Sequence, residues 1–474
     1  MSAQEIEKSS TTPGLPLSLS FGALIEGAQI ERHHRALDRR SLWICVLCMA
    51  LAVVVAPVAR GLIALIGIIT NLAFYGSFST ELTSPANSPL HYGIIVVPVV
   101  GSFVVGLMAR YGSKAIRGHG IPEAMEQILN NESRIPVRMT FLKPLSAAVA
   151  IGTGGPFGAE GPIIATGGAL GSLIGQRIHV SAQERKVLLA AGAAAGMTAI
   201  FGTPFAAILI AIELLVFEFR PRSFIPIALA TLTAISLRPL LFGSAPVIAV
   251  PVFAVAPGNE LLAYALEGLV MGVLSVGIAR STYVIEDIFE KLPLHWMWWP
   301  VLGGLAVGVI GFFSPHTMGV GYDNIERILD GHFLGVALLV FCTLKFLSWS
   351  IALGSGTSGG TLAPIFTIGG GLGVLMGQTM VAVGIPVDLR MAGLVGMAAC
   401  FAGASRALFT SILFALEITH QFATLQPLMV GCVTAFVVSA LLMRTTIMTE
   451  KLVRRGHHVP SEYTAAKPQP LTQP

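Results

Sequence analysis

Charged side chains are scarce in this sequence. Only 11% of its 474 residues are Asp, Glu, Lys or Arg, whereas soluble domains average about 25%. Hydrophobic residues make up 54% of the chain, and its mean hydropathy is +0.77. This composition excludes an ordinary soluble domain, so most of the chain is expected to face lipid or the interior of a helix bundle.

The signatures of several enzyme classes are missing as well. The chain has no GxxxxGK[ST] sequence for nucleotide phosphates, and no HExxH or paired CxxC pattern for a metal. Its five cysteines lie in apolar stretches, and the single CxxC spacing, Cys45 to Cys48, is typical of small residues on one face of a membrane helix. We therefore expect that the protein binds no metal, no cofactor and no nucleic acid, and that it is not an enzyme.

Long apolar runs are abundant, and many others are short or broken. The short and Gly/Pro-interrupted segments are tolerated at membrane depth only where protein or a water-filled path surrounds them. The sequence therefore predicts an all-α, multi-pass membrane protein with broken helices inside the bundle. Runs long enough for spans of ~20 residues lie at 41–73, 92–111, 223–242, 260–283, 297–314, 333–353 and 425–443. Short or broken segments lie at 142–151, 162–175, 187–200, 204–218, 363–384, 390–402 and 407–418.

The charge distribution predicts the orientation of the chain. Residues 1–40 are polar and end in a run rich in Arg and His, which the positive-inside rule places in the cytoplasm. The loop 79–90 carries no Lys or Arg and is expected outside. Residues 457–474 are expected to form a short, disordered cytoplasmic tail. The start of the chain shows no signal-peptide pattern.

A glycine-rich stretch occurs twice in this chain. Residues 152–176 recur 202 residues later as 354–378, with twelve of twenty-five positions identical. A second pair, 205–213 and 409–417, is offset by 204 residues. Repeats in transporters often run in opposite directions across the membrane. The sequence therefore predicts a duplicated membrane domain.

Three glycine/proline turns precede apolar helices: residues 118–122 (GHGIP), 158–162 (GAEGP) and 360–364 (GTLAP). Proline is favoured in the first turn of a helix. A helix start presents unpaired N–H groups and the positive end of the helix dipole, which bind anions. Because such broken helices meet at midmembrane sites in transporters, the turns predict an anion pathway. Glu160 places one acid beside it, as expected for a gate.

Together with residues 446–456 (TIMTEKLVRRG), these turns resemble the CLC family of chloride channels and chloride/proton antiporters. The family signatures are GSGIP, GREGP or GKEGP, GxFxP and SIYxxKLxxRG, in that order. The resemblance covers most of residues 40–456. It implies an inverted-repeat bundle of roughly 18 helices, several of them short or broken at mid-membrane, with repeat halves at about 41–240 and 255–456.

The resemblance also implies partners and a location. It predicts a voltage-gated channel or antiporter, a homodimer with one pore in each subunit, and chloride or a similar anion, with or without protons, as the transported species. The resemblance is to bacterial members, so we expect no C-terminal CBS domain. We therefore expect a bacterial inner membrane protein with both termini in the cytoplasm.

The resemblance assigns roles to individual residues. Glu160 matches the external gating glutamate, whose carboxylate can occupy the anion site in place of a halide. Anion contacts are implied for His119, Gly120, Ile121, Thr361, Leu362 and Met448. The turns themselves are shaped by Gly118, Pro122, Gly158, Gly161, Pro162, Gly360 and Pro364.

Four positions depart from the family pattern. His119 stands where a serine hydroxyl usually touches the central anion, Met448 replaces the tyrosine that supplies the other hydroxyl, and Leu362 replaces the signature phenylalanine. The imidazole is then either protonated toward the anion or neutral and bonded to backbone. Leu214 stands where antiporters carry the glutamate that relays internal protons, next to Glu213, which matches the structural glutamate of that pair. This favours a channel-like or weakly coupled protein.

These residues leave alternative functions open. Fluoride/proton exchange is one, because fluoride-specific members also replace the serine, although they tend to keep the tyrosine. A membrane-embedded enzyme with Glu160 and His119 as an acid–base pair is a remote one, since no nucleophile accompanies them. Glu218 is either a substitute proton relay or a solvated helix end beside Arg220 and Arg222.

Overall fold

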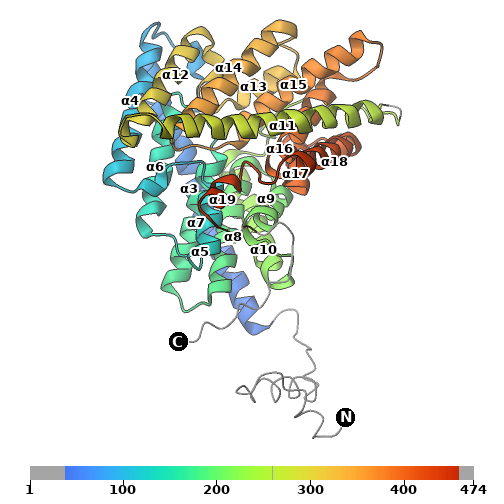
Figure 1. Cartoon of the computed structure of the whole chain (residues 1–474). Coiled ribbons are helices and arrows are strands. Elements are labelled where there is room, and N and C mark those ends of the chain that lie inside the picture. Colours follow the sequence, from blue (N-terminus) through green and yellow to red (C-terminus); the bar gives the residue numbers. More distant parts are fainter. Residues whose placement is uncertain (1–37, 259, 458, 460–474) are drawn as a thin grey trace, which may run out of the picture. The chain divides into compact units, whose positions relative to one another are not determined.

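The computed structural model describes residues 38–258, 260–457 and 459 (Figure 1). Among these residues the chain is all-helical, with two isolated β-bridges and no strand. The all-α prediction is therefore confirmed. The predicted N-terminal segment 1–40 and the tail 457–474 lie almost entirely outside the described residues. The described residues from Ile44 onward belong to one compact unit.

Seventeen α-helices follow one another in the described residues, joined in places by short 3-10 turns, and a π-helical segment, Ala211–Val216, extends α9. They are α3 Arg39–Tyr75, α4 Gly93–Tyr111, α5 Ile121–Asn130, α6 Val137–Gly152, α7 Glu160–Arg177, α8 Ala182–Phe201, α9 Pro204–Ile210, α10 Pro221–Phe242, α11 Leu261–Glu290, α12 Trp299–Phe313, α13 Tyr322–Leu329, α14 Gly335–Gly354, α15 Leu362–Ala382, α16 Leu389–Ser405, α17 Leu408–Thr419, α18 Leu425–Leu442 and α19 Glu450–Arg454.

Eight helices of the described residues are long and apolar enough to cross a membrane. Seven of them match predicted runs, and the eighth, α15, corrects the prediction that 363–384 is short or broken. The helix stays continuous because its glycines serve close packing instead of breaking the chain. A Cβ atom built on Gly369 would lie 2.7 Å from the carbonyl oxygen of Gly396 on α16, so only glycine allows this approach.

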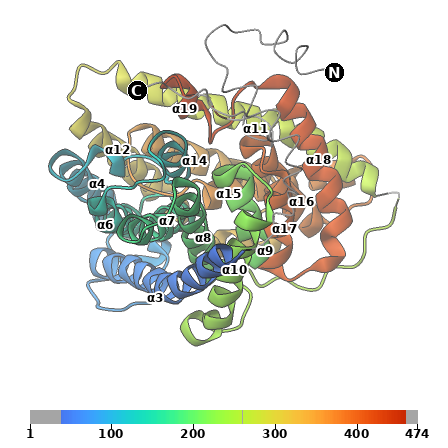
Figure 2. The ribbon, with the colours of Figure 1, turned by 90° about the horizontal axis from the view of Figure 1, so that it is seen from below.

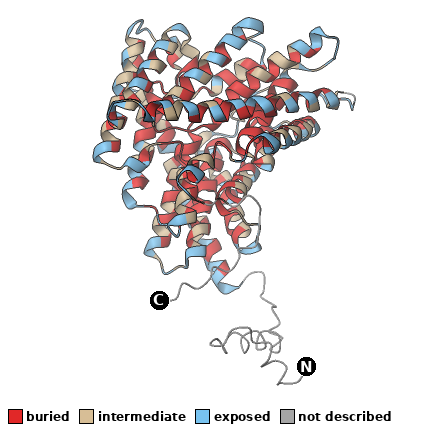
Figure 3. Cartoon of the chain, in the orientation of Figure 1, coloured by how far each residue is buried: buried red, intermediate tan, exposed pale blue. Residues whose placement is uncertain are grey.

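The centre of the bundle consists of two helix pairs, one in each half of the chain. In the first, α7 packs on α8, and in the second, α15 packs on α16. Every residue from Val187 to Phe201 on α8, and from Met391 to Ser405 on α16, is buried (Figure 3). A helix that is buried all round belongs to the interior of a membrane bundle. The segments 187–200 and 390–402 therefore lie inside the bundle, as predicted.

Helices α9 and α17, which pack together (Figure 2), exchange carboxylate caps. The Glu213 carboxylate accepts the N–H groups of Phe409 and Thr410, each at 3.0 Å, and the Thr410 hydroxyl at 2.6 Å. The Glu417 carboxylate accepts the N–H of Phe205 at 3.0 Å and that of the next residue at 2.8 Å. Each acid thus satisfies the unpaired first-turn N–H groups of the other repeat's helix.

Replacing Glu417 by Ala should lower the free energy of unfolding by about 2 kcal/mol, because two N–H groups at the start of α9 lose their acceptor. Thermal unfolding of the purified protein in detergent measures the effect. Asp330→Ala, at an exposed acid after α13, is the control and should change stability little. Equal melting temperatures for Glu417→Ala and the unmutated chain would contradict the capping role.

Candidate functional site

The three glycine turns predicted from the sequence meet in the structure. The N–H of Gly158 donates to the carbonyl of Gly360 at 3.3 Å, and the N–H of Gly360 donates back to Gly158 at 3.0 Å. Gly118 donates to the carbonyl of Thr357 and accepts from Gly359, both at 3.4 Å. Backbone hydrogen bonds therefore join the segments before α5, α7 and α15. We call residues 118–122, 158–162 and 360–364 the turn cluster.

Glycine makes this contact possible. Gly120 has φ +95°, and a Cβ on it would lie 2.4 Å from the carbonyl oxygen of Gly161. A Cβ on Gly161 would lie 2.0 Å from the carbonyl oxygen of His119 and 3.0 Å from the Cα of Gly360. Side chains at these positions would push the three helix starts apart. The prolines of the cluster lie buried in the first turns of their helices: Pro122, Pro162 and Pro364.

Glu160 is the first residue of α7, and its side chain lies inside the turn cluster. The residue is 1% exposed. Its Oε1 accepts a hydrogen bond from the hydroxyl of Tyr322 at 3.0 Å, while Oε2 has no hydrogen-bond partner in the described part of the chain. A Cβ built on Gly360 would lie 3.0 Å from this Oε2. The carboxylate therefore lies against the start of α15, where the helix dipole favours negative charge.

Tyr322, which the sequence reasoning missed, is the first residue of α13. Its hydroxyl accepts the N–H of Ala159 at 3.4 Å and donates to Glu160. Its ring packs edge-on against Phe201 of α8, with ring centroids 5.7 Å apart. One signal was available: the Gly319–Val–Gly321 turn precedes a short amphipathic helix, as GHGIP precedes α5.

All six residues predicted to contact an anion are buried: His119, Gly120, Ile121, Thr361, Leu362 and Met448. The Nδ1 atom of His119 and the hydroxyl of Thr361 have no hydrogen-bond partner among the described residues. The imidazole is thus not tied to backbone through Nδ1. The segment that contains Met448 lies near the glycine turn 118–122, because its neighbour Ile447 lines the same cavity as His119.

That cavity, of about 570 Å³, opens on the His119 side of the turn cluster, and we call it the charged cavity. Two ion pairs tie α19 to α5 at its wall: Lys451–Glu123 at 3.0 Å and Arg455–Glu126 at 2.6 Å. The charged cavity is lined by four acids and four bases, namely Glu123, Glu126, Glu286, Glu290, Lys114, Arg117, Lys451 and Arg455.

Glu123 holds the start of α5 in place. Its Oε2 accepts a hydrogen bond from the N–H of Gly120 at 2.6 Å, and its Oε1 accepts one from the ammonium group of Lys451. Burial by itself would raise the pKa of this carboxyl, but the positive charges of Lys451 and Lys143 bring the pKa well below its ordinary value. The carboxylate therefore remains ionised and fixes the first turn against α19.

Two buried lysines, also missed from the sequence, anchor the segments beside the site. The ammonium group of Lys143 donates to the carbonyls of Ile116 at 2.8 Å and Gly118 at 2.7 Å. The ammonium group of Lys345 donates to the carbonyl of Thr317 at 2.9 Å. The two lysines are separated by 202 residues, the offset of the glycine repeat, and this coincidence could have identified them. Lys143 places a positive charge beside the first turn.

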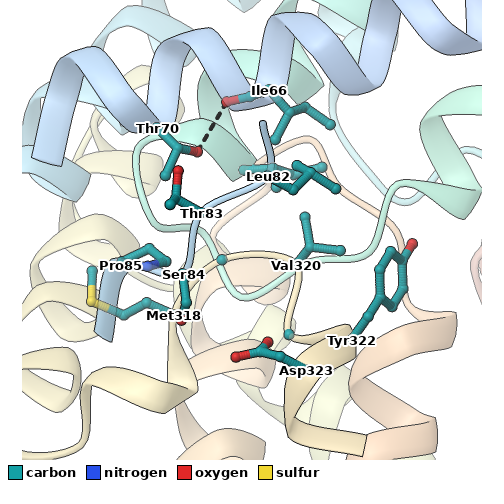
Figure 4. A pocket seen from close by; sticks show the side chains of 13 residues that line it. Ile66, Thr70, Leu82, Thr83, Ser84, Pro85, Met318, Val320, Tyr322 and Asp323 are labelled. Atoms are coloured by element: carbon teal, nitrogen blue, oxygen red, sulfur yellow. Dashed lines mark hydrogen bonds between the residues drawn. The ribbon is translucent and has the colours of Figure 1, made fainter. Parts of the chain in front are cut away.

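A second cavity, of about 220 Å³, lies on the Tyr322 side and is called the small cavity (Figure 4). It is lined by the second half of α3, residues 82–85 and residues 318–323. Helix α12 begins at Trp299, in the charged cavity, and ends at Phe313, shortly before this segment. Fifteen helical residues span about 22 Å. The two cavities therefore lie near opposite ends of α12.

The position of the missing proton glutamate borders a pocket that polar residues also line, among them Glu213, Arg406 and Thr446. Leu214 lies in the π-helical segment and is 4% exposed. Glu218 follows that segment, where it accepts a hydrogen bond from the Ser223 hydroxyl at 2.6 Å and lies 3.9 Å from Arg220. These contacts favour the helix-end interpretation of Glu218.

Comparison with known proteins identifies a matching family model and several similar proteins. The family model described as "Voltage gated chloride channel" matches residues 100–440. A putative ClcB-like chloride channel protein of Ralstonia nicotianae is 30% identical over 375 residues, which cover 76% of this chain and 85% of the relative. The H⁺/Cl⁻ exchange transporter ClcA of Salmonella arizonae is 31% identical over 389 residues, covering 76% and 78%.

Solved structures share the fold. A slow cyanobacterial Cl⁻/H⁺ antiporter superposes with a TM-score of 0.78 at 22% identity, covering 88% of this chain and 98% of its own. A CLC-type fluoride/proton antiporter superposes with a TM-score of 0.72 at 20% identity, covering 85% and 97%. These likenesses confirm the predicted CLC-type, all-α, multi-pass membrane fold.

The close approach at Gly120 can be tested against a matched glycine. Gly120→Ala should destabilise the protein more than Gly384→Ala. Both positions have positive φ, +95° and +87°, so each substitution carries backbone strain of about 1–3 kcal/mol. Only the Gly120 methyl group also collides with backbone, because nothing lies within 4 Å of a Cβ at Gly384. Thermal unfolding in detergent compares the two variants. Equal losses of stability would contradict the role of the close backbone contact at Gly120.

Proposed function

Because this chain belongs to the CLC family, whose model is described as voltage-gated chloride channel, we propose that it moves chloride-like anions across the membrane along a path gated by Glu160. One observation carries the gate: the Glu160 carboxylate lies between helix starts, with one oxygen left without a partner among the described residues. Ionisable groups inside a membrane bundle are generally functional.

The gate works by competition. The N-terminus of each helix carries roughly half a positive charge. The Gly120 N–H already donates to Glu123, so the backbone N–H groups near Ile121, Thr361 and Leu362 are left to attract a negative group. The ionised carboxylate of Glu160 fills that role while the path is closed. Protonation removes its charge, so that a halide replaces it at the helix starts. Anion occupancy is thereby linked to one proton.

The two cavities serve as the mouths of the path. The charged cavity contains Lys114, Arg117, Lys451 and Arg455, and the positive-inside rule places such residues in the cytoplasm. The small cavity is lined by part of the loop 79–90, which has no Lys or Arg, and opens outside. Both termini then lie in the cytoplasm, and the membrane domain extends over residues 41–456.

We assign channel-like or weakly proton-coupled transport to this path. Leu214 is buried and offers no carboxylate to carry protons from the inside. Glu218 is engaged with Ser223 and Arg220 and does not replace it. The named relatives include a putative chloride channel protein and an exchange transporter, so the distinction needs measurement on this chain.

The assembly we propose is a homodimer through α9, α17 and α18. These helices expose apolar side chains, among them Phe205, which is 64% exposed, and Phe409, which is 57% exposed. The segments 204–218 and 407–443 are where the family's interface falls.

Flux from liposomes tests the transport proposal. Purified protein in liposomes loaded with chloride should release chloride when a potassium ionophore clamps the voltage, with much less than stoichiometric proton movement. Fluoride release far above chloride release would replace the substrate assignment with the fluoride alternative. Release of neither anion would refute the proposed function.

Glu160→Gln tests the gate. Glutamine resembles the protonated acid, so the variant should transport anions at a rate that no longer depends on pH, whereas the unmutated protein should be more active at low pH. Chloride flux is measured from about pH 3.5 to 7.5, a range that contains the ordinary glutamate pKa of about 4.3. Glu81→Gln, an exposed acid in the loop 79–90, is the control. A pH profile identical to that of the unmutated chain would remove Glu160 from the gate.

His119→Ser tests the departure from the family pattern. The serine hydroxyl is smaller and cannot carry charge, so selectivity among chloride, bromide and nitrate should change and binding at low pH should weaken. Selectivity is measured from competing fluxes, with His332→Ser as an exposed control. Unaltered selectivity would show that His119 does not contact the transported anion.

A further inference from the structure

Both hydroxyl groups that the family pattern places at the central anion are replaced here, by His119 and Met448. The structure nevertheless holds another hydroxyl beside the proposed gate. The Tyr322 hydroxyl donates to Oε1 of Glu160 at 3.0 Å, and it comes from α13, outside the three turns. The gating carboxylate thus has a side-chain donor that none of the sequence signatures contains.

We propose that Tyr322 is an anion ligand: its hydroxyl donates to the halide that displaces the Glu160 carboxylate, and it helps to set anion affinity. This inference rests on the proposed function, because it requires an anion to occupy the place of that carboxylate. It assigns to Tyr322 more than the positioning of Glu160.

The hydrogen bonds of the hydroxyl set its direction. A tyrosine hydroxyl has one proton to donate and lone pairs to accept with. The N–H of Ala159 donates to the Tyr322 oxygen at 3.4 Å, so the proton of the hydroxyl remains available for Glu160. When the carboxylate leaves, this donor loses its acceptor. A buried donor without a partner is costly, and hydrogen bonds to an anion are stronger than neutral ones.

The aromatic ring is held firmly enough to keep the hydroxyl in place without Glu160. Phe201, 2% exposed, meets the Tyr322 ring edge-on at 5.7 Å and packs in turn on Phe414 at 5.6 Å. Phe414 contacts Phe366 of α15 at 5.0 Å. These rings connect α8, α13, α15 and α17, so the hydroxyl position depends on both halves of the chain.

Tyr322 also borders the route to the site. Figure 4 shows its ring on the wall of the small cavity, beside Asp323 and Val320. The same residue therefore lines the cavity and bonds the carboxylate at the turn cluster. An anion leaving this cavity for the helix starts passes the Tyr322 side chain.

Two roles for the hydroxyl predict different results. If it only steadies the carboxylate, its removal has no effect on a protein that already lacks the carboxylate. If it binds the anion, its removal weakens binding in that protein too. The informative comparison is therefore made in the Glu160→Gln background.

The experiment measures chloride binding by isothermal titration calorimetry of purified protein in detergent. We compare Glu160→Gln with Glu160→Gln/Tyr322→Phe. Phenylalanine keeps the ring contact with Phe201, so folding is expected to survive, and size-exclusion chromatography checks it. The chloride Kd should rise by about tenfold or more, the effect of losing a hydrogen bond to a charged group. Glu160→Gln/Tyr264→Phe, which removes a buried hydroxyl of α11, is the matched control and should bind like Glu160→Gln.

An unchanged Kd after Tyr322→Phe overturns the ligand role, even if the same substitution alters the pH profile of the chain with Glu160 intact. If Glu160→Gln itself binds neither chloride nor fluoride, the proposed function fails first and this inference fails with it. Crystals of Glu160→Gln soaked in bromide give a second readout. Anomalous density within hydrogen-bond reach of the Tyr322 oxygen supports the proposal, and bromide bound only elsewhere in the turn cluster refutes it.

Discussion

Direct backbone contact between three helix starts is the constraint on which the rest of this structure depends. At Gly120, Gly161 and Gly360 the main chains approach so closely that no side chain fits between them. The N–H of Gly120 donates to Glu123, and the N–H of Gly360 donates to the carbonyl of Gly158, so these two groups are satisfied within the protein. The helix starts that meet there still carry partial positive charge, and in the proposed gate the Glu160 carboxylate or an anion balances it. In this view the gate and its substrate are alternative solutions to one packing problem.

The same physical problem recurs in both repeats, and each repeat helps to solve it for the other. Glu213 caps α17, whereas Glu417 caps α9. Lys143 and Lys345, at equivalent positions, bind carbonyl groups of the segments that lead to α5 and α13. Because half-membrane helices cannot complete their own ends, duplication supplies the missing partners. The site follows from this exchange, since the turns from both halves meet where the helix ends are most exposed.

The sequence was most informative where local chemistry determines structure. Apolar runs located seven of the spans, and the prolines of the three turns located helix starts. Glycine runs were ambiguous, because the same residue breaks an isolated helix and permits close packing between two. That ambiguity produced the error at 363–384. Tyr322 was missed because its hydrogen bond joins residues 162 positions apart, a contact that neither periodicity nor a motif encodes.

The mixed lining of the charged cavity has a consequence for the transport path proposed above. Four carboxyl-bearing residues stand beside four basic ones there, and two of the pairs are in direct contact. A vestibule with one sign of charge would concentrate counter-ions and accelerate their capture, an advantage that dissolved salt abolishes. A balanced vestibule offers little such attraction. Entry from that side is then governed by bulk concentration and the width of the opening, and it stays nearly constant as ionic strength varies.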